Sequence, residues 1–458
     1  MRLVAGLVLS AFLVTLPTQA QVTPFQHVIM IIQENRSPDN LFNDPNLIAA
    51  GADIQTFGVN SSGQKITLQP VALANNYDLG HNHANFLEMY DNGKMDGADK
   101  VDCVAVGGAC PPNPQFRYVD NSDGTIEPYF QLAEQYSFAN RMFQTNQGSS
   151  FTAHQFLFSG TSAISEFSEW MAAESPNGNG KGFGIGCTAA AAEFVNLINP
   201  LGLEIETAFP CFEHPTLTDM LDDAGVSWKY YSPSANSMFT APNAIRHICA
   251  PSNSDCTGKD WLNDVVLNQA QVLTDIANCN LSQVNWVIPT LQASDHPEDN
   301  QGLGPSWVAS IVNAVGTSTC NPSYWSNTAI LITWDDWGGW YDHVPPFRLG
   351  QRNRWGAGLV YGFRVPLVVV SAYTPQGYIS NVTHDFGSFL RFVEYVFSGP
   401  NGPLGPIPPG FYADAYADNL FDFFNFKQAP RPFKVIPATH DARYFINDTS
   451  PRLDPDTD

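Results

Sequence analysis

Residues 28–37 read VIMIIQENRS, and this segment indicates the fold class. Its first five residues are apolar and mostly β-branched, and the run stops abruptly at polar residues. Such a pattern is typical of a buried strand in a parallel sheet. Similar strand-like runs recur at 285–289, 328–333 and 366–371. We therefore expect several buried strands that end in polar segments.

Helical patterns lie between or after these runs, each with an apolar face that ends at a glycine. The two clearest sets are Leu217, Met220, Leu221 and Ala224 before Gly225, and Val308, Ile311, Val312 and Val315 before Gly316. Strands that alternate with helices predict an α/β fold with a mostly parallel sheet. The stretches at about 166–211 and 236–260 are polar, turn-like and cysteine-bearing, so we interpret them as loop-rich insertions on one core. Residues 21–458 are accordingly predicted to form a single domain.

The composition of the chain limits the classes of molecule that it is expected to bind. The 458 residues are 44% hydrophobic and only 14% charged, and 44 acidic against 21 basic side chains give a formal charge of −23. A surface this acidic argues against nucleic acid as a partner. It would also repel anionic lipid, so a membrane substrate would have to be met through apolar contacts.

The N-terminus and the cysteines predict export. Residues 1–20 contain a basic start, an apolar run and a small-residue cleavage site at Ala20, which together resemble a secretory signal. A retained anchor is the alternative, but the apolar run is shorter than the ~20 residues of a bilayer span. We expect a secreted or periplasmic protein with no transmembrane anchor. We expect the eight cysteines to form disulfides. The sequence does not determine how they pair, and sequential pairing with short loops at 103/110 and 249/256 is one possible arrangement.

Polar residues directly after buried strands are the first candidates for chemistry, because ligands of open α/β sheets gather at the carboxyl edge. Glu34 and Asn35 follow one strand, and Asp335 and Asp336 follow another. Adjacent carboxylates tied to a core strand repel each other unless a cation neutralises them, so the pair predicts a metal site. The alternative is that both aspartates are solvated loop residues.

A hydroxyl cluster and scattered histidines are the remaining candidates. Ser149 and Ser150 precede a helical pattern, where exposed backbone N–H groups favour an anion such as phosphate. An ordinary serine N-cap is the alternative. Each histidine, taken singly, is more often a structural residue than a functional one. His81, His296 and His384 stand beside strand ends or helix starts and are therefore retained as candidates.

Taken together, the motifs resemble those of the bacterial phospholipase C and acid phosphatase family of secreted phosphoesterases, a branch of the alkaline-phosphatase superfamily. The resemblance runs from about His27 to Phe433. It rests on six blocks, which are 33–42, 78–97, 218–231, 295–297, 334–344 and 371–394. It implies a three-layer α/β/α sandwich and hydrolysis of phosphate esters.

The same resemblance implies roles for individual residues. Glu34, Asn35, Asp335 and Asp336 would hold a divalent metal ion, which could be Ca²⁺, Mg²⁺ or Zn²⁺. Ser150 would be the nucleophile in contact with that metal. The histidines that would contact the phosphoryl oxygens or protonate the leaving group are His81, His296, His343 and His384.

The nucleophile block departs from the family pattern. Where many phospholipases read Gly-Pro-Thr-x-Pro-Asn-Arg, this chain reads GSSFTAH at 148–154, so Ser149 is an alternative nucleophile. Because the sequence ends soon after the last of these blocks, we also expect no counterpart of the extra C-terminal β-domains of the longer phospholipases. The leading hypothesis is a phospholipase C-like enzyme with a seryl-phosphate intermediate. The alternatives are an acid phosphatase acting on phosphomonoesters and, in a different class, a non-catalytic binding protein on the same scaffold.

Overall fold

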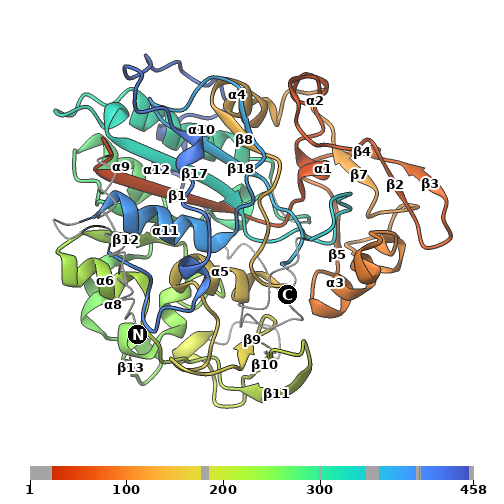
Figure 1. The fold of residues 1–458 in the computed structure, drawn as a ribbon, viewed down its shortest axis with the longest axis horizontal. Helices are drawn as coiled ribbons and strands as arrows, with labels where there is room; N and C mark the ends of the chain where they lie inside the picture. Colours follow the sequence, from red (N-terminus) through yellow and green to blue (C-terminus); the bar gives the residue numbers. More distant parts are fainter. Residues whose placement is uncertain are drawn as a thin grey trace, which may run out of the picture.

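The structure is a computed structural model that describes residues 23–176, 185–298, 301–346, 361–398, 402 and 404–452. The predicted signal at residues 1–20 lies outside these residues. At the centre is a six-stranded sheet in the order β15, β12, β16, β1, β17, β18 (Figure 1). These strands are β15 (Val265–Val266), β12 (Trp228–Tyr231), β16 (Val284–Val287), β1 (His27–Gln33), β17 (Thr328–Trp334) and β18 (Leu367–Val370). All pair in parallel except β18, which runs antiparallel to β17.

The strand predicted at 28–32 is the middle of this sheet. β1 pairs with β16 on one side and β17 on the other, so that Met30 lies opposite both Trp286 and Leu331. Residues 28–32 have no exposed surface. Burial on both faces explains why this strand reads as an uninterrupted apolar run. The four strands predicted from sequence are confirmed, and β12 and β15 are additional.

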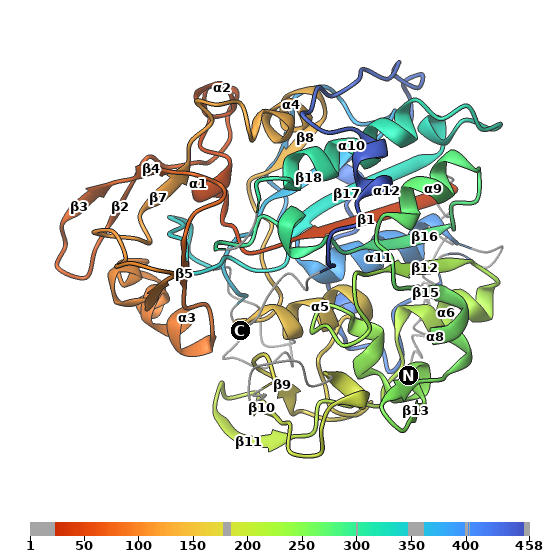
Figure 2. The ribbon, with the colours of Figure 1, turned by 180° about the vertical axis from the view of Figure 1, so that it is seen from behind.

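Helices cover both faces of the sheet, which confirms the predicted three-layer α/β/α architecture (Figures 1 and 2). One layer contains α4 (Glu127–Gln135), α9 (Gln271–Ala277), α10 (Gly304–Gly316) and α12 (Ala442–Asn447). The other contains α5 (Ser150–Ser159), α6 (Leu217–Ala224) and α11 (Phe386–Val396). The helix predicted before Gly225 is α6, where a capping box at Thr216 starts the helix and Gly225, at φ 68°, ends it.

Short elements surround these layers. They are α1 (Pro38–Leu41), α2 (Pro45–Ala50), β8 (Ser137–Ala139), α7 (Arg246–Cys249), β13 (Pro251–Ser252), β14 (Asp255–Cys256), α8 (Lys259–Asp264) and β19 (Tyr378–Ser380). No helix among the described residues is both long and apolar enough to cross a bilayer.

A lobe beside the sheet has its own apolar cluster, drawn in orange in Figure 1. Its elements are β2 (Phe57–Val59), β3 (Lys65–Thr67), β4 (Gln69–Val71), β5 (Tyr77–Leu79), α3 (His83–Tyr90), β6 (Cys103–Ala105) and β7 (Arg117–Val119). Trp337 and Trp340, from the loop after β17, are fully buried in this cluster, where Phe86 packs against Trp337. The lobe therefore anchors the loop that begins with Asp335 and Asp336.

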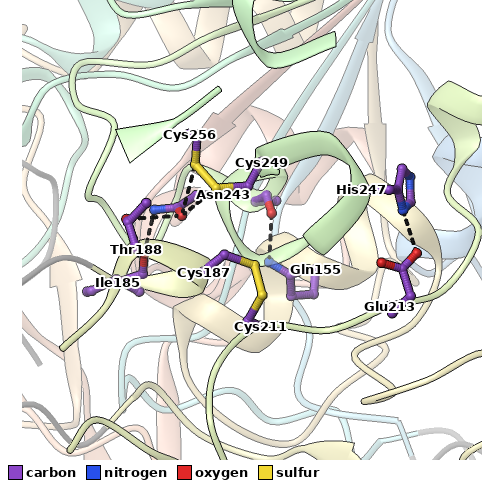
Figure 3. Close-up of a disulfide and its surroundings, with 11 residues drawn as sticks. Gln155, Ile185, Cys187, Thr188, Cys211, Glu213, Asn243, His247, Cys249 and Cys256 are labelled. Atoms are coloured by element: carbon purple, nitrogen blue, oxygen red, sulfur yellow. Dashed lines mark hydrogen bonds and ion pairs between the residues drawn. A yellow bond between two sulfur atoms is a disulfide. The ribbon is translucent and has the colours of Figure 1, made fainter. Parts of the chain in front are cut away.

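Four disulfides hold the irregular parts, and their pairing is sequential: Cys103–Cys110, Cys187–Cys211, Cys249–Cys256 and Cys279–Cys320. In the first predicted insertion, the described part forms a three-stranded sheet of β9 (Met171–Ala172), β10 (Val195–Ile198) and β11 (Glu204–Ala208). The Asn243 side chain lies between two disulfides and donates to the Ile185 carbonyl (Figure 3). It also donates to the Ala235 carbonyl at 2.7 Å. Gln155 of α5 donates to the Ala241 carbonyl at 3.2 Å, which joins the second insertion to this helix.

Candidate active site

Two strand ends meet at the carboxyl edge of the sheet. Gln33 and Trp334 are the last residues of β1 and β17 and lie opposite each other in the register. Glu34, Asn35, Asp335 and Asp336 follow them, and all four side chains are fully buried. The Asn35 backbone N–H donates to Asp335 Oδ1 at 3.2 Å, so the two turns are directly bonded to one another.

Ser150 reaches this pair of turns from α5. It is the first residue of the helix, has no exposed surface, and its Oγ donates to Asp336 Oδ2 at 2.9 Å. Ser149 is bonded elsewhere, because its Oγ accepts from the Ser175 N–H at 2.9 Å and lies 3.0 Å from the Ser175 hydroxyl. Of the two serines, it is Ser150 that hydrogen-bonds to the aspartate pair.

Two predicted histidines meet at the Asn35 amide. When the amide nitrogen faces the carboxylates, it donates to Glu34 and Asp335, both at 3.1 Å, and the amide oxygen accepts from the Nε2 atoms of His81 and His296, both at 3.2 Å. In this orientation every donor meets an acceptor when no cation is bound. With the amide turned over, its oxygen faces the carboxylates, as a metal ligand would, and its nitrogen lies 3.2 Å from His81 Nε2. The Nδ1 atoms face the carbonyls of Leu79 and Pro297. Each imidazole can therefore donate two hydrogen bonds when it is doubly protonated.

The two aspartates have opposite electrostatic environments. Burial raises the pKa of Asp336 well above its ordinary value; the repulsion of Asp335 adds to this effect, and the charge of His81 only partly offsets it. Burial also disfavours the charged form of Asp335, but the nearby His154 imidazole, with the Ser150 hydroxyl, outweighs it and lowers the pKa of this carboxyl. A cation placed between them would allow both to ionise.

A histidine that the sequence analysis did not select completes the cluster. His154 lies one turn after Ser150 on α5, and its Nε2 is 3.6 Å from both Glu34 Oε1 and Asp335 Oδ2. One ligand atom from each of Glu34, His154 and Asp335 lies within 4.8 Å of the others. The i, i+4 spacing from Ser150 is the sequence signal that could have identified it, because residues four apart share a helix face. Buried oxygen and nitrogen donors that converge in this way fit a divalent cation.

A cleft of about 360 Å³ opens beside this cluster, with His81 and Ser149 in its wall. Acidic side chains from several elements also line it, namely Asp78, Asp102 and Glu174. Burial and the nearby charge of Glu204 raise the pKa of Glu174 to about 8. Ser150 itself is fully buried and does not line the cleft, so the cleft meets the cluster at His81 and Ser149.

Comparison with known proteins identifies the family of this chain. Residues 25–400 match the Phosphoesterase family. The chain belongs to the Phosphoesterase family.

Curated relatives of this phosphoesterase include several bacterial phospholipases C. Hemolytic phospholipase C of Pseudomonas aeruginosa is 23% identical over 451 residues, which cover 87% of this chain and 56% of that protein. Non-hemolytic phospholipase C of Burkholderia pseudomallei is 22% identical, covering 90% and 61%. Phospholipase C A of Mycobacterium tuberculosis is also 22% identical, covering 90% and 80%. The chain thus spans about three fifths of the length of the first two relatives.

Solved structures resemble this phosphoesterase only weakly. A protein in the alkaline phosphatase superfamily from Vibrio parahaemolyticus aligns at a TM-score of 0.36 and 9% identity, covering 88% of this chain and 71% of that chain. Ps i-CgsB in complex with k-i-k-neocarrahexaose aligns at a TM-score of 0.34 and 9% identity, covering 81% of this chain and 72% of that chain. Similarity at this level carries no inference about the site.

Two predicted histidines of the phosphoesterase lie in other side-chain groups. The His343 ring bonds to Asp39 at 2.8 Å and to Asp53 at 3.1 Å. His384 is 3.4 Å from Asp422 and 3.9 Å from Asp418. The structure therefore gathers Glu34, Asn35, Ser150, Asp335, Asp336, His81 and His296, and gives His343 and His384 different partners.

Proposed function

We propose that this chain is a metal-dependent, phospholipase C-like phosphoesterase that forms a seryl-phosphate intermediate at Ser150. The observation that carries the proposal is the buried hydrogen bond from Ser150 Oγ to Asp336, at the edge where β1 and β17 end. A hydroxyl that already donates to a carboxylate has an acceptor for its proton.

The predicted ligands fit a divalent ion. Glu34, Asn35, Asp335 and Asp336, with the Ser150 hydroxyl, would hold it, since adjacent buried carboxylates need a cation to be charged together. When bound, such an ion neutralises charge on the phosphoryl oxygens and favours ionisation of a nearby hydroxyl.

The residues of the cluster can divide the chemistry among them. Ser150 Oγ attacks phosphorus and passes its proton to Asp336, while the bond from phosphorus to the leaving-group oxygen breaks. His81 and His296 present Nε2 atoms that can donate to phosphoryl oxygens. A proton from an acid in the site neutralises the leaving alkoxide, and water then hydrolyses the seryl phosphate and restores the Ser150 hydroxyl. Phosphoryl transfer depends chiefly on positioning and charge of this kind.

The names of the relatives favour a phospholipid substrate, and an acid phosphatase acting on phosphomonoesters is the second candidate. We propose that the chain acts after export, outside the cell or in the periplasm, in keeping with its four disulfides. The net charge of −23 speaks against nucleic acid as a partner. We further propose that residues 21–458 act as one domain.

The test compares Ser150→Ala with Ser149→Ala. Release of p-nitrophenol from p-nitrophenyl phosphorylcholine and from p-nitrophenyl phosphate is followed across pH 4–9, with and without EDTA. Loss of the nucleophile should lower kcat by about 10⁴-fold or more, whereas Ser149→Ala should retain most of it. Full activity of Ser150→Ala would overturn the assignment. Activity on the monoester alone at acid pH would favour the phosphatase, and no turnover of either substrate with metal restored would favour a binding protein.

A further inference from the structure

His154 is a buried histidine without a conventional bonding partner. Its side chain has no exposed surface, and within the described residues neither ring nitrogen makes a hydrogen bond. Leaving a buried polar atom without a hydrogen bond is unfavourable by about 1–3 kcal/mol in general. Such an atom in a functional cluster calls for a partner that the protein chain itself does not provide.

The ring is aimed at two carboxylates. Nε2 is 3.6 Å from Glu34 Oε1 and 3.6 Å from Asp335 Oδ2, beyond the range of a hydrogen bond. Ligand atoms about 2.1 Å from one shared ion lie roughly 3.0–3.4 Å from each other at octahedral or tetrahedral angles. The two 3.6 Å separations at His154 are slightly longer than this range. They fit three ligands around one ion better than a hydrogen bond between the imidazole and either carboxylate.

Neighbouring elements hold the ring in this position. The Phe239 ring meets it edge-on, with centroids 4.8 Å apart. Phe239 belongs to the second insertion, which Gln155 links to α5. The orientation of His154 is therefore set by aromatic packing on one side and by its helix on the other.

We propose that His154 Nε2 is a ligand of the metal, so that the centre is a mixed nitrogen and oxygen site selective for Zn²⁺ and similar transition ions over Ca²⁺ and Mg²⁺. An imidazole suits Zn²⁺ and its neighbours, whereas Ca²⁺ and Mg²⁺ take oxygen ligands. The inference rests on the proposed function in one respect, which is that an ion occupies this cluster.

Metal binding, measured apart from turnover, tests the proposal. The full-length chain is stripped with chelator and titrated by calorimetry with Zn²⁺ or Ca²⁺ alone, for the wild type, His154→Gln and His214→Gln. His214 is a matched control, because it is also a buried histidine but its ring bonds to the Pro215 carbonyl in a different part of the fold. We expect the wild type to bind Zn²⁺ far more tightly than Ca²⁺, and His154→Gln to lose at least about tenfold in Zn²⁺ affinity. Its Ca²⁺ affinity and the Zn²⁺ affinity of His214→Gln should change by less than about threefold.

Failures of the two proposals can be told apart. If the wild type binds no divalent ion, metal dependence and this inference both fail. If it binds Zn²⁺ and His154→Gln binds it equally well, or if the wild type prefers Ca²⁺, only the role of His154 is overturned. Should His154→Gln fail to fold, X-ray absorption of the zinc-loaded wild type decides instead: imidazole scattering supports the proposal, and a spectrum with oxygen ligands alone contradicts it.

Discussion

Glu394 and Asp414 are two buried carboxyl groups placed close together, the first on α11 and the second in the turn at Ala413–Ala415. Burial, with the charge and hydrogen bond of Asp414, raises the pKa of Glu394 to about 9. Burial raises the pKa of Asp414 to about 6. Arg391 offsets these effects only in part. We predict that Glu394→Gln, an uncharged side chain of nearly the same shape, stabilises the protein at alkaline pH.

The sign follows from proton binding in the two states. Glu394 has an ordinary pKa of 4.5 and a folded pKa of about 9, so the folded state binds the proton more tightly. Its contribution to stability is fully present below pH 4.5 and is lost as the pH rises toward 9. The loss is about 1.4 kcal/mol per pH unit, or at most about 4 kcal/mol between pH 5 and pH 8. Glutamine does not titrate, so the variant escapes this loss.

Urea unfolding at pH 5, 6.5 and 8, with the disulfides intact, measures the difference. Glu394→Gln should exceed the wild type in free energy of unfolding by under about 1 kcal/mol at pH 5 and by up to about 4 kcal/mol at pH 8. Glu88→Gln, at an exposed position on α3, should show no such trend. A gain of the same size at pH 5 and pH 8 would refute the reasoning.

Two further substitutions probe the support of the site. Gly338 has a φ of +60°, and the Cβ that Gly338→Ala adds would lie 2.4 Å from the Asn35 carbonyl oxygen. We therefore expect kcat to fall at least about tenfold, although no metal ligand is removed. Unchanged kcat in a folded variant would contradict this. His343→Gln should lower the free energy of unfolding more at pH 6 than at pH 9. Burial lowers the pKa of His343, but Asp39 and Asp342 outweigh it and raise this pKa overall. The stabilisation by the charged imidazole is therefore lost as the pH rises through the folded pKa. Urea midpoints at the two pH values check it, and equal losses would count against an ionic role.

The sequence predicts those strands whose burial on both faces produces an uninterrupted apolar run. Residues 28–32 and 328–333 are uninterrupted apolar runs because both faces are buried. β12 was not selected since its four residues include Lys229, whose ammonium group reaches Asp275 at 2.7 Å and is thereby tolerated within a sheet strand. β15 has two residues and presents too short a pattern to detect.

In the candidate site, too, the sequence predicts the residues that strand ends position but not the contacts that depend on tertiary packing. Asp335 and Asp336 could be selected because a strand end positions them, and adjacent strands bring Glu34 and Asn35 beside them. The spacing from Ser150 places His154 on the same face of α5, but the sequence does not predict its contacts with Glu34 and Asp335. Those contacts depend on how α5 packs against both strand ends. Likewise, the acidic partners of His343 come from residues some 300 positions away, at Asp39 and Asp53. Tertiary contacts of this kind have no local signature.

The link between α5 and the second insertion affects how the protein should be prepared. Gln155, which follows His154 directly, is bonded to Ala241, and Asn243 two residues later lies between the Cys187–Cys211 and Cys249–Cys256 bridges. Protein made in a reducing cytosol would lack these cross-links next to the very helix that carries Ser150. Preparations for kinetic or metal work should therefore come from an oxidising expression host, and thiol titration should precede every comparison of variants.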